Sequence, residues 1–107
     1  IGDVEGKTCI LVDDIIDTAG TIWNAADALK KGGASKVVSY ATHAVLSGPA
    51  IERINDSKLD ELIVTDTIPL SESASKLEKI KIISMDETLS EAINRVNKEE
   101  SISAMFL

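Results

Sequence analysis

The stretch Ile10-Leu-Val-Asp-Asp-Ile-Ile-Asp-Thr-Ala-Gly-Thr21 joins an apolar run to a loop of small and acidic residues and then to a helical pattern. The apolar run, Lys7 to Val12, has the length and composition of a buried β-strand. A glycine-containing loop is predicted from Asp14 to Gly20, followed by a helix from Thr21 to about Lys31. The predicted apolar face of this helix consists of Ile22, Ala25, Ala26 and Leu29.

The rest of the chain repeats the alternation of strand and helix. Three more strands and two more helices are predicted: strands at 36–42, 62–65 and 80–84, and helices at 49–55 and 86–96. Asp86 or Thr88 is expected to cap the last helix, and the polar residues 71–75 are expected to form a loose loop. The alternation indicates an α/β fold, a mostly parallel sheet flanked by helices. A chain of 107 residues forms one domain, or most of one.

Composition narrows the possible functions. The formal net charge of −7 repels polyanions, which argues against general nucleic-acid binding. A small anion can still bind where backbone N–H groups and a helix end overcome that field. No apolar run reaches the roughly 18 residues of a membrane span, and no signal peptide is visible. The single Cys9 is expected to be a buried, inert thiol in a cytoplasmic protein.

The first strand ends in two carboxylates, Asp13 and Asp14. In open α/β sheets, ligands bind just beyond the carboxyl ends of the strands. Neighbouring strand residues point to opposite faces, so the two carboxylates cannot share one role unless the backbone turns between them. A carboxylate can accept two hydrogen bonds from a vicinal diol such as that of ribose, or it can hold a divalent cation.

The loop Asp17-Thr-Ala-Gly-Thr21 has the properties of an anion site. Small residues let the backbone approach a ligand, and Gly20 permits a positive φ. The free N–H groups at the start of the helix favour a phosphate, and the Thr18 and Thr21 hydroxyls can add donors. Asp17 is expected to bind loop N–H groups, ribose or metal rather than the phosphate. Taken singly, these residues favour ordinary turns and caps, but the run as a whole favours an anion site.

The same residues carry a family resemblance. Val12 to Thr21 resembles the phosphoribosyl-diphosphate motif of type I phosphoribosyltransferases. Three neighbouring blocks resemble the ribose-phosphate diphosphokinases (phosphoribosyl-diphosphate synthases): Gly2-Asp-Val-Glu-Gly-Lys7, Thr42-His-Ala-Val-Leu-Ser-Gly-Pro-Ala50 and Ser101-Ile-Ser-Ala-Met-Phe106. This resemblance implies that residues 1–107 are the C-terminal part of a type I phosphoribosyltransferase-like domain, whose upstream part is absent.

The resemblance also implies an activity and its site residues. Enzymes of this family transfer the diphosphate of ATP to ribose 5-phosphate, with Mg²⁺, to make 5-phospho-α-D-ribose 1-diphosphate. By resemblance, Asp13 binds ribose with Asp14 as its helper, and the phosphate is bound by Asp17, Thr18, Ala19, Gly20 and Thr21. An allosteric phosphate or ADP site is implied at Ser101, Ser103 and Phe106, and this regulatory role is preferred to the alternative that the tail only packs.

In the family, the ATP site, the metal-binding residues and the catalytic basic loop lie upstream of the counterpart of this chain. The segment alone is therefore expected to be inactive, with no catalytic residue or metal ligand of its own. Since the chain opens with Ile1 rather than Met, the true start of the protein is expected upstream. In the family a mobile catalytic loop immediately precedes the counterpart of Gly2, so the longer protein is expected to have been cut or left incomplete at that loop. The whole enzyme is expected to be a homo-oligomer, a dimer or a hexamer.

Three alternatives remain open. The chain can be a non-catalytic regulatory homologue of the same family, or part of a nucleobase phosphoribosyltransferase that shares the loop. It can also be a receiver-type signalling domain, in which Asp66 at a later strand end would be the phosphoacceptor. His43, just past the second strand, is interpreted as structural rather than catalytic, and Trp23 can pack inward or meet another subunit.

Overall fold

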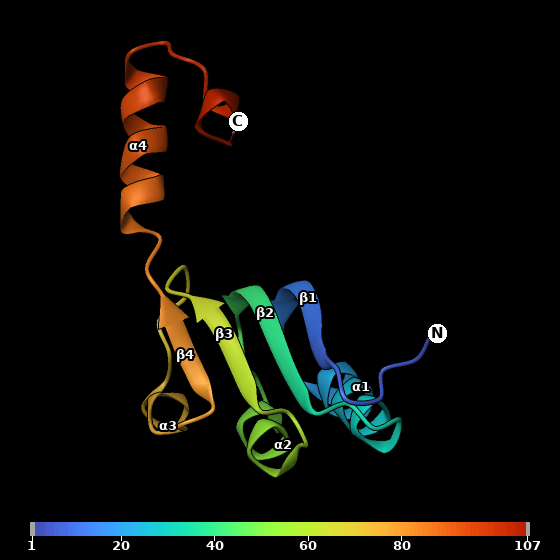
Figure 1. Cartoon of the computed structure of the whole chain (residues 1–107). Helices are drawn as coiled ribbons and strands as arrows, with labels where there is room; N and C mark the ends of the chain where they lie inside the picture. Colours follow the sequence, from blue (N-terminus) through green and yellow to red (C-terminus); the bar gives the residue numbers. More distant parts are fainter. Residues whose placement is uncertain (1, 107) are drawn as a thin grey trace.

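The computed structural model describes residues 2–106, and these form a four-stranded parallel sheet with the strand order β1-β2-β3-β4 (Figure 1). The strands are β1 (Thr8–Ile16), β2 (Lys36–Ala44), β3 (Glu61–Thr65) and β4 (Ile80–Ile83). The helices are α1 (Gly20–Lys31), α2 (Ala50–Asp56), α3 (Glu72–Ser75), α4 (Asp86–Asn97) and the 3₁₀ turn η1 (Ser103–Phe106). The predicted α/β fold with a parallel sheet is therefore confirmed.

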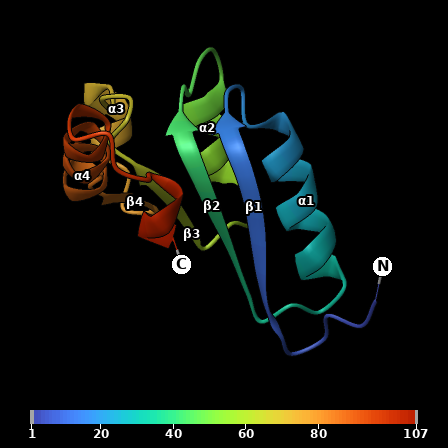
Figure 2. The ribbon, with the colours of Figure 1, turned by 90° about the horizontal axis from the view of Figure 1, so that it is seen from above.

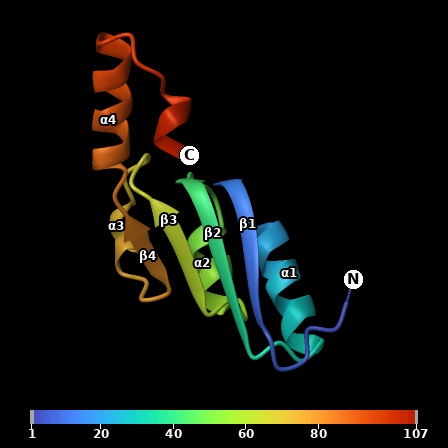
Figure 3. The ribbon, with the colours of Figure 1, turned by 45° about the horizontal axis from the view of Figure 1, so that its top comes forward.

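One face of the sheet carries the core. Figure 3 shows α1 and α2 behind the strands and no helix across the front of β1 and β2. Ile22 and Ala26 of α1 are buried, as their spacing predicts, and Ala25 and Leu29 are half-buried. The largest fully buried apolar side chains come from β2, from β3, from α2 and from the loop that follows α2 in the sequence: Val37, Leu62, Val64, Ile54 and Leu59.

The first strand differs from its prediction in length and in burial. β1 continues through both aspartates to Ile16, and most of its residues are exposed. Val12 is 80% exposed, and Cys9 is half-buried rather than buried. A continuous apolar run is typical of a parallel strand covered on both faces. Here β1 is the edge of the sheet, and within the described residues only one of its faces is covered.

Two local predictions in the second half of the chain are wrong. Residues 72–75 form the short helix α3 instead of a loose loop, because the Ser71 hydroxyl accepts the Ala74 N–H at 3.1 Å and caps it. Neither Asp86 nor Thr88 caps α4. The N-cap is Met85, whose N–H instead donates to the Asp66 carboxylate at 2.8 Å.

The last helix stands apart from the sheet. None of the residues of α4 is buried, and Ile93 is 70% exposed. Figure 2 shows α4 and α1 at opposite sides of the molecule. The radius of gyration is 16.3 Å, larger than the roughly 13 Å of a compact domain of this length. Within residues 2–106, no helix is both long and apolar enough to cross a membrane.

Candidate functional site

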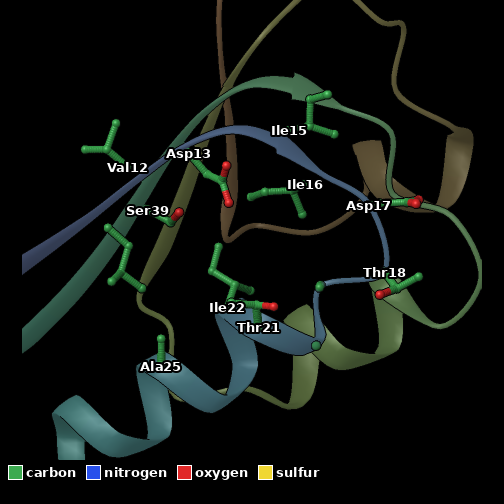
Figure 4. A pocket seen from close by; sticks show the side chains of 13 residues that line it. Val12, Asp13, Ile15, Ile16, Asp17, Thr18, Thr21, Ile22, Ala25 and Ser39 are labelled. Carbon is green, nitrogen blue, oxygen red and sulfur yellow. The ribbon is translucent and has the colours of Figure 1, made fainter.

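A cavity of about 360 Å³ lies where the end of β1 leads into α1 (Figure 4). Its walls come from β1, the connecting loop, the first half of α1 and one residue of β2. The lining residues are Leu11, Val12, Asp13, Ile15, Ile16, Asp17, Thr18, Ala19, Gly20, Thr21, Ile22, Ala25 and Ser39. The cavity therefore lies at the carboxyl end of a parallel strand, where ligands of α/β proteins bind. All five residues of the predicted anion loop, Asp17 to Thr21, line this cavity.

The loop backbone differs from the prediction in one respect. Ala19, the N-cap of α1, has the left-handed conformation with φ 65° and ψ 13°. Gly20 is already the first helical residue and does not have a left-handed φ. The expected positive φ at Gly20 was therefore assigned one residue too late. A left-handed non-glycine residue costs about 1–2 kcal/mol, so contacts elsewhere must hold this turn.

The partial positive charge at the start of α1 is not neutralised by a side chain of the helix itself. The helix carries no side-chain cap and no acidic residue in its first turn. Among residues 2–106, no acceptor is found for the N–H groups of residues 18–22 or for the Thr18 and Thr21 hydroxyls. The first N–H groups of a helix carry about half a positive charge, so this end of α1 is suited to an anion.

The segment between β2 and α2 holds the beginning of the loop. The Ser47 hydroxyl donates to the Asp17 carboxylate, and the Ser47 N–H donates to the Asp17 carbonyl at 3.0 Å. The N–H groups of Val45 and Leu46 both donate to the Ile16 carbonyl, at 3.0 and 3.1 Å. The partner of Asp17 is thus a hydroxyl from another loop rather than an N–H group of its own loop. Sequence reasoning missed Ser47, which is 30 positions away.

The two aspartates of β1 have different surroundings. Asp13 lines the cavity, whereas Asp14 does not, because the strand continues without a turn between them. The Asp13 carboxylate accepts the Asp14 N–H at 2.8 Å. A hydrogen bond with the Asp13 side chain lowers the pKa of Asp14, and backbone N–H groups, with His43 nearby, lower it further. Of the two, only Asp13 is placed to meet a ligand in this cavity.

Two polar residues near the cavity were not predicted. The side chain of Ser39 is fully buried, and among the described residues its hydroxyl has no hydrogen-bond partner. Buried polar groups are usually paired, so a free hydroxyl in a cavity wall is a candidate ligand contact. Arg53 of α2 donates from Nη1 to the Thr18 carbonyl at 3.1 Å. No periodicity connects either residue with the loop, so sequence patterns carried no signal for them.

The described residues do not form a metal site by themselves. Within residues 2–106, no three His, Cys, Asp or Glu side chains gather in a way that could hold a metal ion. Mg²⁺ is often bound by only one or two carboxylates together with substrate phosphates. Asp13 could serve as such a single carboxylate. His43 is bonded from Nδ1 to the Thr67 hydroxyl at 2.8 Å, which gives it a structural partner.

The predicted regulatory residues lie together near the end of the chain. The hydroxyls of Ser101 and Ser103 are 3.1 Å apart, and Arg95 donates to the Ser101 carbonyl at 2.8 Å. Phe106, at the end of η1, is 72% exposed. Asp66, the phosphoacceptor of the receiver alternative, has its pKa lowered first by the Met85 N–H bond. That bond gives Asp66 a structural role at the start of α4.

Comparison with known proteins identifies the family. The model of the phosphoribosyl synthetase-associated domain matches residues 1–107. Proteins named ribose-phosphate pyrophosphokinase are 60% identical over 107 residues in Xanthomonas axonopodis pv. citri and 61% identical over 106 residues in a Marinomonas species. The matches cover 100% and 99% of this chain but only 34% of each relative.

A solved structure agrees with these relatives. The crystal structure of phosphoribosylpyrophosphate synthetase from Mycobacterium smegmatis has a TM-score of 0.87 and 42% identity, covering 92% of this chain and 33% of that one. The chain thus spans about a third of the length of the relatives it matches. Its predicted place as their C-terminal part stays a prediction. The resemblance seen in the motifs is confirmed at the level of the family: the chain belongs to the phosphoribosyl synthetase-associated domain family.

Proposed function

We propose that this chain is the ribose 5-phosphate-binding segment of a ribose-phosphate diphosphokinase. The whole enzyme would transfer the diphosphate of ATP to ribose 5-phosphate and release 5-phospho-α-D-ribose 1-diphosphate. One observation supports the proposal: the start of α1, whose first N–H groups have no acceptor among residues 2–106, and the Asp13 carboxylate line the same cavity. Its volume of about 360 Å³ is within the roughly 300–1,000 Å³ of small-molecule sites.

Each part of the site has its own role in this proposal. The N–H groups of residues 18–22 bind the 5-phosphate, and the Thr18 and Thr21 hydroxyls add donors. Asp13 accepts the hydrogen bonds of the ribose diol. Asp17 stays paired with Ser47, so its negative charge is partly satisfied away from the phosphate. Asp14, outside the cavity lining, has at most an indirect role.

The remaining steps are assigned to the rest of the enzyme. In this proposal, the ATP site, the catalytic basic residues and most Mg²⁺ ligands lie in the remainder of the enzyme, since this chain matches only 34% of each relative. The segment alone is accordingly expected to be inactive. Assembly as a dimer or hexamer, regulation by phosphate and ADP, and a cytoplasmic location are carried over as predictions from the family resemblance and the cysteine content.

An activity assay tests the proposal. The enzyme that contains this segment should form phosphoribosyl diphosphate from ATP and ribose 5-phosphate, and Asp13→Ala or Gly20→Val should raise the KM for ribose 5-phosphate. Wild-type kinetics in both variants would reject the site. No product from the complete wild-type enzyme would favour the non-catalytic homologue. If the enzyme instead converts phosphoribosyl diphosphate and a nucleobase into a nucleotide, with release of diphosphate, it is a nucleobase phosphoribosyltransferase.

The regulatory part of the proposal needs a separate test. Ser103→Ala removes one of the two paired hydroxyls, the one at the first residue of η1. We expect a changed sensitivity to ADP or phosphate with nearly unchanged basal turnover. If the response to both effectors stays at the wild-type level, Ser101, Ser103 and Phe106 are packing residues of the tail.

A further inference from the structure

Arg53 connects α2 with the anion loop. Its Nη1 donates to the Thr18 carbonyl at 3.1 Å, across 35 positions of sequence. Arg53 is half-buried, and it takes part in none of the ion pairs found among residues 2–106. Its positive charge is therefore directed at the loop rather than neutralised by a carboxylate. In a chain of net charge −7, this places a cation beside the start of α1.

The contact with Arg53 also explains the glycine at position 20. A Cβ added to Gly20 would lie 3.1 Å from the Arg53 Nη1 and 3.8 Å from its Cζ, and no other heavy atom outside its immediate neighbours and helix backbone lies within 4 Å. The φ of Gly20 is not left-handed, so its conformation does not require glycine. Glycine here leaves room for the guanidinium to reach the loop.

We propose that Arg53 is the positioning residue of the anion loop. In a trans peptide the C=O and the following N–H point in opposite directions. By holding the Thr18 carbonyl, Arg53 fixes the Ala19 N–H away from α2 and stabilises the left-handed turn at Ala19. Its charge also offsets part of the negative charge of Asp17. The inference rests on the proposed sugar-phosphate site, because it assigns the residue that keeps this site open.

The test is an NMR titration of this chain with ribose 5-phosphate, following the amide signals of residues 18–22. Arg53→Met should weaken binding about tenfold, the effect of losing one charge-assisted hydrogen bond. Arg53→Lys should regain part of the affinity, because it keeps the charge but lacks the planar donors. The matched control is Lys31→Gln, which removes a positive charge at the far end of α1 and should bind as the wild type does.

Gly20→Ala supplies a second, independent measurement. Beside Arg53 the added methyl group should displace the guanidinium and weaken binding severalfold. In the Arg53→Met background, Gly20→Ala should cause no further loss of binding affinity, because the Arg53 Nη1 that the methyl group would crowd is absent. Equal effects of Gly20→Ala in both backgrounds would contradict the proposed contact.

The outcomes separate the two proposals. If ribose 5-phosphate shifts none of the loop signals of the wild-type chain, the proposed function fails. If the wild type binds and Arg53→Met binds equally well, only the role of Arg53 fails. If Arg53→Met does not fold, as judged from its spectrum, Arg53→Lys and Gly20→Ala decide, and unchanged affinity in both overturns the proposal.

Discussion

Replacing Asp13 by asparagine removes one negative charge from the cavity and keeps the size of the side chain. In the proposed site this carboxylate holds the ribose diol, while the phosphate lies at the start of α1. Asp13→Asn should therefore weaken ribose 5-phosphate binding but not the binding of inorganic phosphate. Phosphate binding should stay the same or improve slightly, because a like charge has left its neighbourhood.

The expected loss follows from the hydrogen bonds that Asp13 already makes. One carboxylate oxygen accepts the Asp14 N–H at 2.8 Å, so this oxygen is partly occupied. One or two hydrogen bonds to the diol remain. A hydrogen bond to a charged group contributes about 1 kcal/mol more than a neutral one. We expect a loss of about 1–2 kcal/mol, or about 5- to 30-fold in Kd.

Isothermal titration calorimetry measures both ligands directly. Asp56→Asn is the matched control, since Asp56 is an exposed carboxylate at the end of α2 and does not line the cavity. Asp14→Asn should have a smaller effect than Asp13→Asn. Equal losses for ribose 5-phosphate and phosphate in Asp13→Asn would refute the assignment of the diol to this carboxylate, and so would wild-type affinity for the sugar phosphate.

Three further predictions concern stability. Lys79 donates to three backbone carbonyls at the end of α2, at 2.9–3.3 Å, so Lys79→Met should lower the free energy of urea unfolding by about 2–3 kcal/mol. Partial burial alone would raise the pKa of Asp60, but the Val37 N–H and the Lys30 ammonium, at 2.7 and 3.0 Å, lower it below 3.8. The stability from this carboxylate is therefore present above pH 3.8 and lost as the pH falls further. Asp60→Asn should lower the free energy of unfolding by about 1 kcal/mol near pH 7. When unfolding is measured at a series of pH values, this variant should also lose less stability than the wild type as the pH falls below 3.8. Ser39→Ala removes a buried hydroxyl without a described partner and should stabilise the free chain by about 1 kcal/mol in a thermal melt, whereas a lower melting temperature would show that the hydroxyl is satisfied.

The local patterns of the sequence predicted most of the fold. The spacing of Ile22 and Ala26 placed the buried face of α1 correctly, because a helical period depends only on near neighbours. The alternation of strands and helices predicted the parallel sheet. The burial of β1 was predicted wrongly. A continuous apolar run is typical of a strand covered on both faces, but the sequence of the strand does not show whether a second layer is present.

In the candidate site, too, the local motif was predicted and the long-range contacts were not. The loop from Asp17 to Thr21 was visible as a continuous motif, whereas Ser47 and Arg53 reach it only through tertiary packing. The positive φ was expected at glycine on steric grounds but occurs at Ala19. Gly20 is small for a different reason, the approach of a side chain from α2. Such a contact leaves no trace in the local pattern.

A crystal structure with ribose 5-phosphate bound would show directly whether the start of α1 is a phosphate site. We expect electron density for the phosphate at the start of α1, within hydrogen-bond distance of the N–H groups of residues 18–22, and for the ribose diol beside Asp13. Density for the phosphate elsewhere on the chain, or a loop whose N–H groups are bonded to the protein's own side chains instead, would contradict this expectation.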